Sequence, residues 1–210
     1  NSTDDLKGKT LGVWFYGNEY PFLSWMSRLG LATDGSADGV TVLKQGWGVE
    51  PLTEGQAACV STMSYNEYWV VRDAGYSPEQ LTVFKYQTEG ASTLEDGLYV
   101  LEKNLGDSSF KDKMVRFVRA SMKGWKYAEA NPKEAASIIL DNDDAGVQTE
   151  KHQVRMMGEI AKLTAGSNGA LDPADYQRTV KVLMSGASDP VITKEPSGAW
   201  THDITNAALN

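Results

Sequence analysis

The chain has 210 residues, of which 41% are hydrophobic and 23% charged, and its formal net charge is -8 at pH 7. These values are ordinary for a globular protein long enough for one large domain or two small ones. Its Lys and Arg residues are scattered rather than gathered in a basic stripe, which argues against nucleic-acid binding, and no apolar run approaches the roughly 20 residues of a membrane-spanning helix.

The cysteine and histidine content restricts the chemistry. Cys59 is the single cysteine, so no internal disulfide forms, and its place within an apolar run favours a buried structural thiol over a nucleophile. With only His152 and His202 besides this cysteine, we expect no zinc site, and we expect both histidines to be solvated. The polar residues 1–5 do not show the pattern of a signal peptide.

Strands and helices alternate in the first part of the chain. β-branched and aromatic residues predict strands at residues 10–15, 40–44, 57–63 and 81–86. Between them, helices are predicted from Asn18 or Glu19 to Leu31, over residues 48–55 and over residues 68–74. This alternation is typical of a parallel sheet covered by helices.

After about residue 105 the pattern becomes almost entirely helical. A Gly-bearing stretch at residues 87–93 and a predicted strand at 97–101 come first. Apolar residues at helical spacing and the prolines at 132 and 173 then predict four helices, at residues 110–131, 133–140, 149–164 and 173–185. The tail from Gly186 contains two further Pro and two Gly residues and is predicted to be an extended surface strap.

Two polar clusters follow predicted strands. Asn18-Glu19-Tyr20 comes after the first strand, and Asn66-Glu67-Tyr68 comes after the third. The carboxyl ends of strands in open α/β sheets are where ligands bind, because loops and helix N-termini converge there. Two amide and carboxylate pairs with aromatic neighbours therefore suggest a pocket for a flat, nitrogen-rich, polar molecule.

Glu67 is the first candidate for a ligand contact. A carboxylate held at a strand end can accept hydrogen bonds from the ring N–H and the exocyclic amine of an aminopyrimidine. The alternative is a first-turn Glu that only favours the helix dipole.

The other candidate contacts also have structural alternatives. Asn18, with Glu19 beside it, is either a contact or a helix N-cap, and Asn66 supplies the amide next to Glu67. Aromatic residues at strand ends could stack on a planar ring or belong to the core, and these are Trp14, Tyr16 and Tyr65. Glu95 either reaches the cleft from the opposite side or is a solvated turn acid, and Trp47 is a candidate loop aromatic over the cleft.

Five short motifs, taken together, resemble one protein family. They are Leu6-Lys7-Gly8-Lys9, Gly17-Asn18-Glu19, Tyr65-Asn66-Glu67-Tyr68, Leu94-Glu95-Asp96-Gly97 and Ala130-Asn131-Pro132-Lys133-Glu134-Ala135. The chain resembles the substrate-binding proteins of ABC importers, in the group similar to thiamine-pyrimidine-precursor binding proteins. Relatives in that group take riboflavin, alkanesulfonates or nitrate. The resemblance covers about residues 6–205, and the ordered set is more specific than any one motif.

The resemblance implies an α/β fold of the type II periplasmic-binding-protein kind, with two hinged lobes that close over a solute. By this analogy residues 5–88 are the αβ second lobe. Residues 89–210 are then the hinge return and the helix-rich C-terminal half of the first lobe. The implied partners are a small heterocyclic solute and an ABC permease, and the implied location is the periplasmic or extracellular face of the membrane.

In this comparison, the opening strands and helices of the family's first lobe have no counterpart ahead of Asn1. Either the chain was truncated or cleaved, or it is a half-clamp that is completed by a partner chain. An incomplete lobe would expose sheet edge and apolar surface, and a homodimer is one way to cover them.

Two other functions are also compatible with these residues. One is a stand-alone module that dimerises and has lost or changed its ligand. The other is an enzyme, because proteins similar to this family include a synthase of the thiamine pyrimidine. That synthase uses its own histidine, a lysine-bound pyridoxal phosphate and a cysteine-rich iron-binding motif. Cys59 stands alone, so we predict a binding protein without catalytic residues, cofactor or metal.

Overall fold

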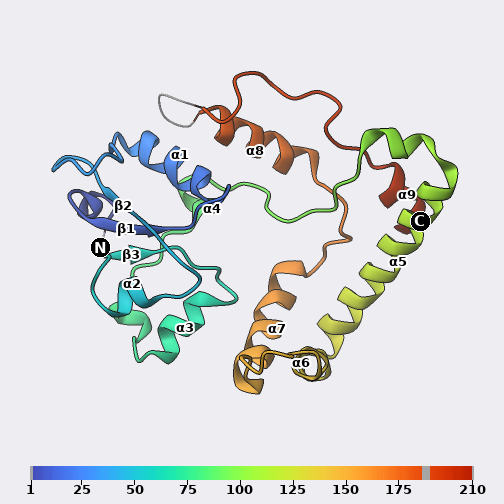
Figure 1. Cartoon of the computed structure of the whole chain (residues 1–210), viewed down its shortest axis with the longest axis horizontal. Helices are drawn as coiled ribbons and strands as arrows, with labels where there is room; N and C mark the ends of the chain where they lie inside the picture. The colour runs from blue at the N-terminus through green and yellow to red at the C-terminus, as the bar shows by residue number, and fades with distance from the viewer. Residues whose placement is uncertain (1, 186–189, 210) are drawn as a thin grey trace. The chain divides into compact units, whose positions relative to one another are not determined.

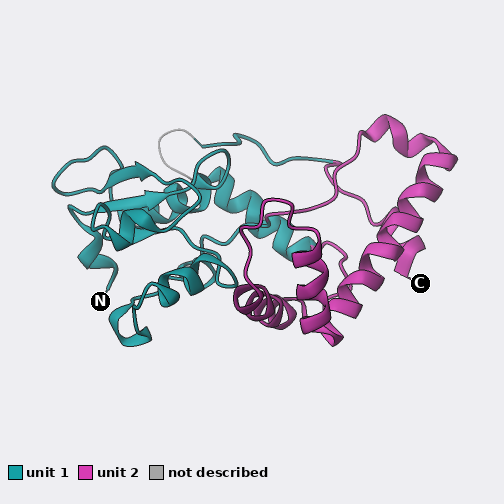
Figure 2. Ribbon diagram, turned by 60° about the horizontal axis from the view of Figure 1, so that its bottom comes forward, with its two compact units in different colours: residues 1–94, 173–197 teal, residues 95–172, 198–210 magenta. Residues whose placement is uncertain are grey.

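A computed structural model describes residues 2–185 and 190–209 of the chain. The chain divides into two units, shown in different colours in Figure 2. Unit 1 contains Asn1–Leu94 and Pro173–Ser197, and unit 2 contains Glu95–Asp172 and Gly198–Asn210. The predicted division into family lobes at residues 88 and 89 stays a prediction.

A three-stranded parallel sheet forms the centre of unit 1 (Figure 1). Strand β1 (Thr10–Val13) lies between β2 (Thr41–Lys44) and β3 (Cys59–Val60). In the register, Leu11 is opposite both Val42 and Cys59. Leu11 and Val13 are almost completely buried, as expected for a central strand with both faces covered. The first three predicted strands are confirmed, although each is shorter than its apolar run.

Helix α1 (Glu19–Leu29) forms for the reasons that the sequence predicts. Phe22, Trp25 and Met26 fall at helical spacing and are buried in one cluster with the residues of β1. Gly30 then adopts a left-handed conformation with φ of 71°, and its N–H bonds to the carbonyl groups of Met26 and Ser27. This C-cap ends the helix. Glycine suits the position, because residues with a Cβ adopt the left-handed conformation at a cost.

The remaining helical segments of unit 1 are short except for α8. Two short helices follow strands: α2 (Glu50–Thr53) after β2 and α3 (Glu67–Asp73) after β3. The others are η1 (Thr3–Leu6), η2 (Pro78–Gln80), α4 (Tyr86–Glu89) and α8 (Pro173–Met184). Helix α8 packs against α1, where the hydroxyl groups of Ser24 and Ser185 are 3.3 Å apart.

Two predicted strands are wrong. Residues 81–85 and 97–101 are irregular, and Tyr86 begins helix α4. In the first segment Phe84 packs against Trp25 with 5.4 Å between ring centres, so its aromatic side chain serves the core and not a sheet. In the second, Leu98 and Leu101 are more than half exposed. Among the described residues neither segment has a neighbouring strand to supply ladder hydrogen bonds, and β-propensity alone does not form a strand.

The regular elements described in unit 2 are all helical, as predicted for most of the chain after about residue 105. It contains η3 (Glu102–Gly106), α5 (Ser108–Ala130), α6 (Pro132–Asp141), α7 (Glu150–Thr164) and α9 (Asp203–Leu209). Asp107 caps α5 by accepting a hydrogen bond from the N–H of Ser109 at 2.8 Å, and Thr149 caps α7. Helices α6 and α7 bury Ala135, Ala136 and Met157 between them.

The prediction for the tail is wrong at its end. The four residues from Gly186 lie outside the described residues, and residues 190–202 contain no helix or strand. Helix α9 follows them and packs against α5. Arg119 donates hydrogen bonds to the carbonyl groups of Ala207 and Ala208, which are end groups of a helix that otherwise lack partners within it. None of the described helices is both long and apolar enough to cross a membrane.

Candidate ligand-binding edge of the sheet

The loops that follow the three strands start at one edge of the sheet, because the strands are parallel. The register places Val13 next to Lys44, and Gly12 next to Val60. The predicted contact residues in unit 1 therefore lie between the end of a strand and the first turn of the next helix. Most follow β1 or β3, and Trp47 follows β2. Glu95 belongs to unit 2.

Both carboxylate oxygens of Glu67 have partners within its own loop. Oε2 accepts a hydrogen bond from the main-chain N–H of Met63 at 2.9 Å, and Oε1 accepts one from the side-chain amide of Asn66 at 2.8 Å. Glu67 is half-buried and is the first residue of α3. These bonds hold the loop between β3 and α3. Each carboxylate oxygen can accept a second hydrogen bond, so they leave capacity for a ligand.

The neighbours of Glu67 share this partly shielded position. Asn66 precedes the helix but makes no side-chain cap bond to it, because its amide is turned toward Glu67. Tyr65, like Asn66, is half-buried. The segment thus holds an amide, a carboxylate and an aromatic ring within three consecutive residues.

The first cluster, after β1, is also organised by local hydrogen bonds. The side-chain amide of Asn18 donates to the carbonyl group of Phe15 at 3.2 Å. The carboxylate of Glu19 accepts from the N–H of Gly17 at 2.7 Å. Asn18 occupies the N-cap position of α1 without making the side-chain cap bond. Asn18 therefore has the position that the N-cap alternative predicts, but its side chain does not make the hydrogen bond of an N-cap.

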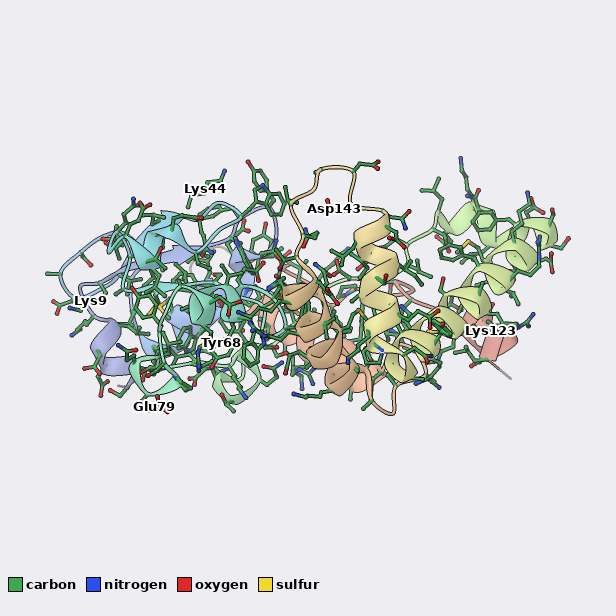
Figure 3. All side chains as sticks on the ribbon, turned by 90° about the horizontal axis from the view of Figure 1, so that it is seen from below. Lys9, Lys44, Tyr68, Glu79, Lys123 and Asp143 are labelled. Carbon is green, nitrogen blue, oxygen red and sulfur yellow. The ribbon has the colours of Figure 1, made fainter. Side chains whose placement is uncertain are left out.

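Tyr16 is strained and exposed. Among the described residues it is the one non-glycine residue with a positive φ, which is 65°, and its side chain is 91% exposed. The ammonium group of Lys44 lies 4.4 Å from the centre of its ring. The side chain of Lys44 is labelled in Figure 3 at the margin of unit 1. Left-handed conformations of bulky residues are costly and collect at functional sites.

Trp14 connects the loop after β1 to the loop after β2. Its indole N–H donates to the carbonyl group of Gly46 at 3.0 Å, and its ring is half-buried. Trp47, which follows Gly46 in the chain, is 96% exposed. The edge of the sheet therefore carries two aromatic side chains, Tyr16 and Trp47, that the described residues leave almost uncovered.

Sequence reasoning missed Gln45, which follows β2 directly and is 5% exposed. Its side-chain amide bonds to the main chain of both Gly48 and Ser61. The only sequence signal was a polar residue immediately after a strand. Ser61 lies 16 residues further along the chain, and no periodic pattern connects the two positions.

Two further titratable groups, Cys59 and Glu95, have raised pKa values. Burial raises the pKa of the Cys59 thiol, which keeps it protonated at neutral pH. Glu95 is exposed, yet partial loss of hydration and repulsion from Asp96 raise its pKa. Within the residues that the structure describes, no group of three His, Cys, Asp or Glu residues could hold a metal ion.

Comparison with known families identifies the class of protein. Residues 1–135 match the family described as NMT1/THI5 like. The chain belongs to this family, which is part of the substrate-binding group of ABC transporters that includes thiamine-precursor, nitrate and alkanesulfonate binding. A search of curated proteins found no match. The family implies a periplasmic-binding-protein-like fold, and the parallel sheet with its many helices confirms the predicted α/β class.

Proposed function

We propose that the chain is the solute-binding component of an ABC importer and that it captures a small planar heterocycle such as a thiamine pyrimidine precursor. The observation that carries this proposal is the composition of one sheet edge. Loops from three adjacent strands bring exposed aromatic rings and a half-buried carboxylate to the carboxyl ends of parallel strands. Family membership supports a solute-binding role.

Each proposed contact has a role suited to such a solute. Tyr16, Trp14 and Tyr65 would stack on the ring, since an aromatic pair contributes about 0.5–1.5 kcal/mol beyond its buried area. Glu67 would accept hydrogen bonds from ring and exocyclic N–H groups, as in charge-assisted pairs. Asn18, Glu19 and Asn66 would complete the hydrogen bonding.

The resemblance supports two further parts of the proposal. Glu95, in the hinge return, would contribute from the side of the cleft opposite the αβ lobe, and closure of the lobes on the solute would shift an equilibrium between open and closed forms. A permease at the periplasmic or extracellular face of the membrane would then receive the solute. Family members are mostly substrate-binding proteins, although a synthase is among them, and this favours binding over catalysis.

Thermal unfolding with a panel of heterocycles tests the ligand class. A ligand at 100 times its Kd stabilises a protein by about 2.7 kcal/mol. For a chain of this size that corresponds to a rise in Tm of roughly 5–10 °C. We expect such a rise with 4-aminopyrimidines or with riboflavin. If none of these compounds raises the Tm, the proposed ligand class is wrong.

A further inference from the structure

The side chain of Gln45 lies between the loop after β2 and the loop after β3. Its Nε2 donates to the carbonyl group of Ser61 at 2.9 Å and to that of Gly48 at 3.1 Å. Its Oε1 accepts from the N–H of Ser61 at 2.8 Å. A buried amide with three partners is held in one orientation, because loss of any bond would leave a buried polar group unsatisfied.

This bridge joins two strands that are not neighbours in the sheet. The order is β2-β1-β3, so the ends of β2 and β3 are separated by β1. Gln45 is anchored to β1 by its own N–H, which donates to the carbonyl group of Val13 at 2.9 Å. Its side chain then exchanges a pair of hydrogen bonds with the main chain of Ser61, as a neighbouring strand would.

Gly12 leaves the space through which this side chain passes. A Cβ at Gly12 would lie 3.2 Å from Oε1 of Gln45 and 3.3 Å from the carbonyl oxygen of Cys59. It would also lie 3.1 Å from a methyl carbon of Val60. All three distances are tighter than ordinary van der Waals contact, so a side chain at this central position would crowd the bridge.

We propose that Gln45 is a positioning residue that makes the two loops move as one. Gly48, which it binds, adjoins the exposed Trp47, and Ser61 begins the loop that leads to Glu67 at the start of α3. A contact made by a solute with one loop is thereby transmitted to the other. The binding of a solute rests on the proposed function, whereas the coupling of the loops is a property of the free protein.

Two N–H groups report on the two loops separately. The indole N–H of Trp14 is protected by the carbonyl group of Gly46, in the loop after β2. The main-chain N–H of Met63 is protected by the carboxylate of Glu67, in the loop after β3. Their hydrogen exchange, followed by NMR on the unliganded full chain, measures how often each loop opens.

Gln45→Met tests the bridge. It keeps the length of the side chain and removes its hydrogen bonds, so exchange at both reporters should accelerate by roughly tenfold or more. The amide of Met26 within α1 should change much less, which separates loop release from general destabilisation. Gln56→Met is the matched control, because Gln56 is exposed and its amide bonds only to Glu54 among the described residues.

Glu67→Gln tests the coupling itself. It weakens the acceptor for Met63 directly, and through the bridge it should also accelerate exchange at the indole of Trp14. In the Gln45→Met background this remote effect should disappear. Should Gln45→Met not fold, Gln45→Glu takes its place: it removes both donors of the bridge and keeps the acceptor for the Ser61 N–H, so the remote effect should be reduced.

Unchanged exchange at Trp14 in the Gln45 variant would overturn the proposal, as would equal acceleration at Trp14 and Met26. Persistence of the remote effect without the bridge would also overturn it. No solute is needed for these measurements, so a failure to bind any heterocycle leaves their outcome unaffected.

Discussion

The ammonium nitrogen of Lys44 lies 3.1 Å from the hydroxyl oxygen of Tyr16, across the ends of β1 and β2. This contact accompanies the left-handed backbone of Tyr16, which turns an almost fully exposed ring outward at the edge of the sheet. The exposed contact is worth only about 0.5–1 kcal/mol, which is too little to account for the strained conformation on its own. A role for the ring in binding would explain why a residue other than Gly occupies this position.

The strain at Tyr16 can be measured with two substitutions. Tyr16→Gly and Tyr16→Ala both remove the ring and its contact with Lys44, so they differ mainly in the cost of a positive φ. We expect the Gly variant to be about 1 kcal/mol more stable than the Ala variant in urea unfolding. Equal stability of the two variants would show that the backbone at this position is not strained.

Arg119 should hold the C-terminal helix of unit 2. Arg119→Met removes both donors to the carbonyl groups of Ala207 and Ala208, and we expect a loss of about 1–2 kcal/mol. Hydrogen exchange in α9 should accelerate. Arg116→Met is the control, because its i,i+4 pair with Asp112 is exposed and contributes only about 0.3–0.5 kcal/mol. An equal effect of the two substitutions would mean that Arg119 does not anchor α9.

The raised pKa of Glu95 predicts a pH-dependent effect. Partial loss of hydration and the charge of Asp96 make the folded chain bind the Glu95 proton more tightly than the unfolded chain does. Stability is therefore lost as the pH rises through the raised pKa. Glu95→Gln should raise the Tm at pH 7 and have little effect near pH 4, where the carboxyl group is mostly protonated in the folded state. A benefit that is independent of pH would contradict this.

The sequence predicted those elements whose signals are local. Helices α1 and α5 have apolar residues at helical spacing and recognisable ends, such as Gly30 and Asn131. Residues 81–86 and 97–101 have the composition of strands, but a strand also needs a neighbour, and composition does not say whether one is present. The helix at the end of the chain was missed because it is short and its stability depends on contacts with α5.

In the candidate site, too, features with local signals could be predicted and those that depend on distant contacts could not. The two Asn-Glu-Tyr clusters were placed correctly after β1 and β3, because parallel strand ends follow from the alternation of strands and helices. Asn18 bonds to Phe15, and Glu67 bonds to Met63. Both bonds are compatible with a ligand contact and also with a residue that only supports the start of a helix. Gln45 could not be found, since its role depends on a partner across the sheet and on the missing Cβ of Gly12.

We propose that Glu67 is both a loop-forming residue and a ligand contact. Isothermal titration of the wild-type chain and of Glu67→Gln with 4-amino-2-methylpyrimidine tests it most directly. Glu150→Gln is the matched control, because Glu150 is also the first residue of a helix but lies in unit 2. We predict that Glu67→Gln weakens binding at least about tenfold, because a charged acceptor is lost, while Glu150→Gln binds as the wild type does. Equal affinity of the Glu67 variant and the wild type would contradict the account.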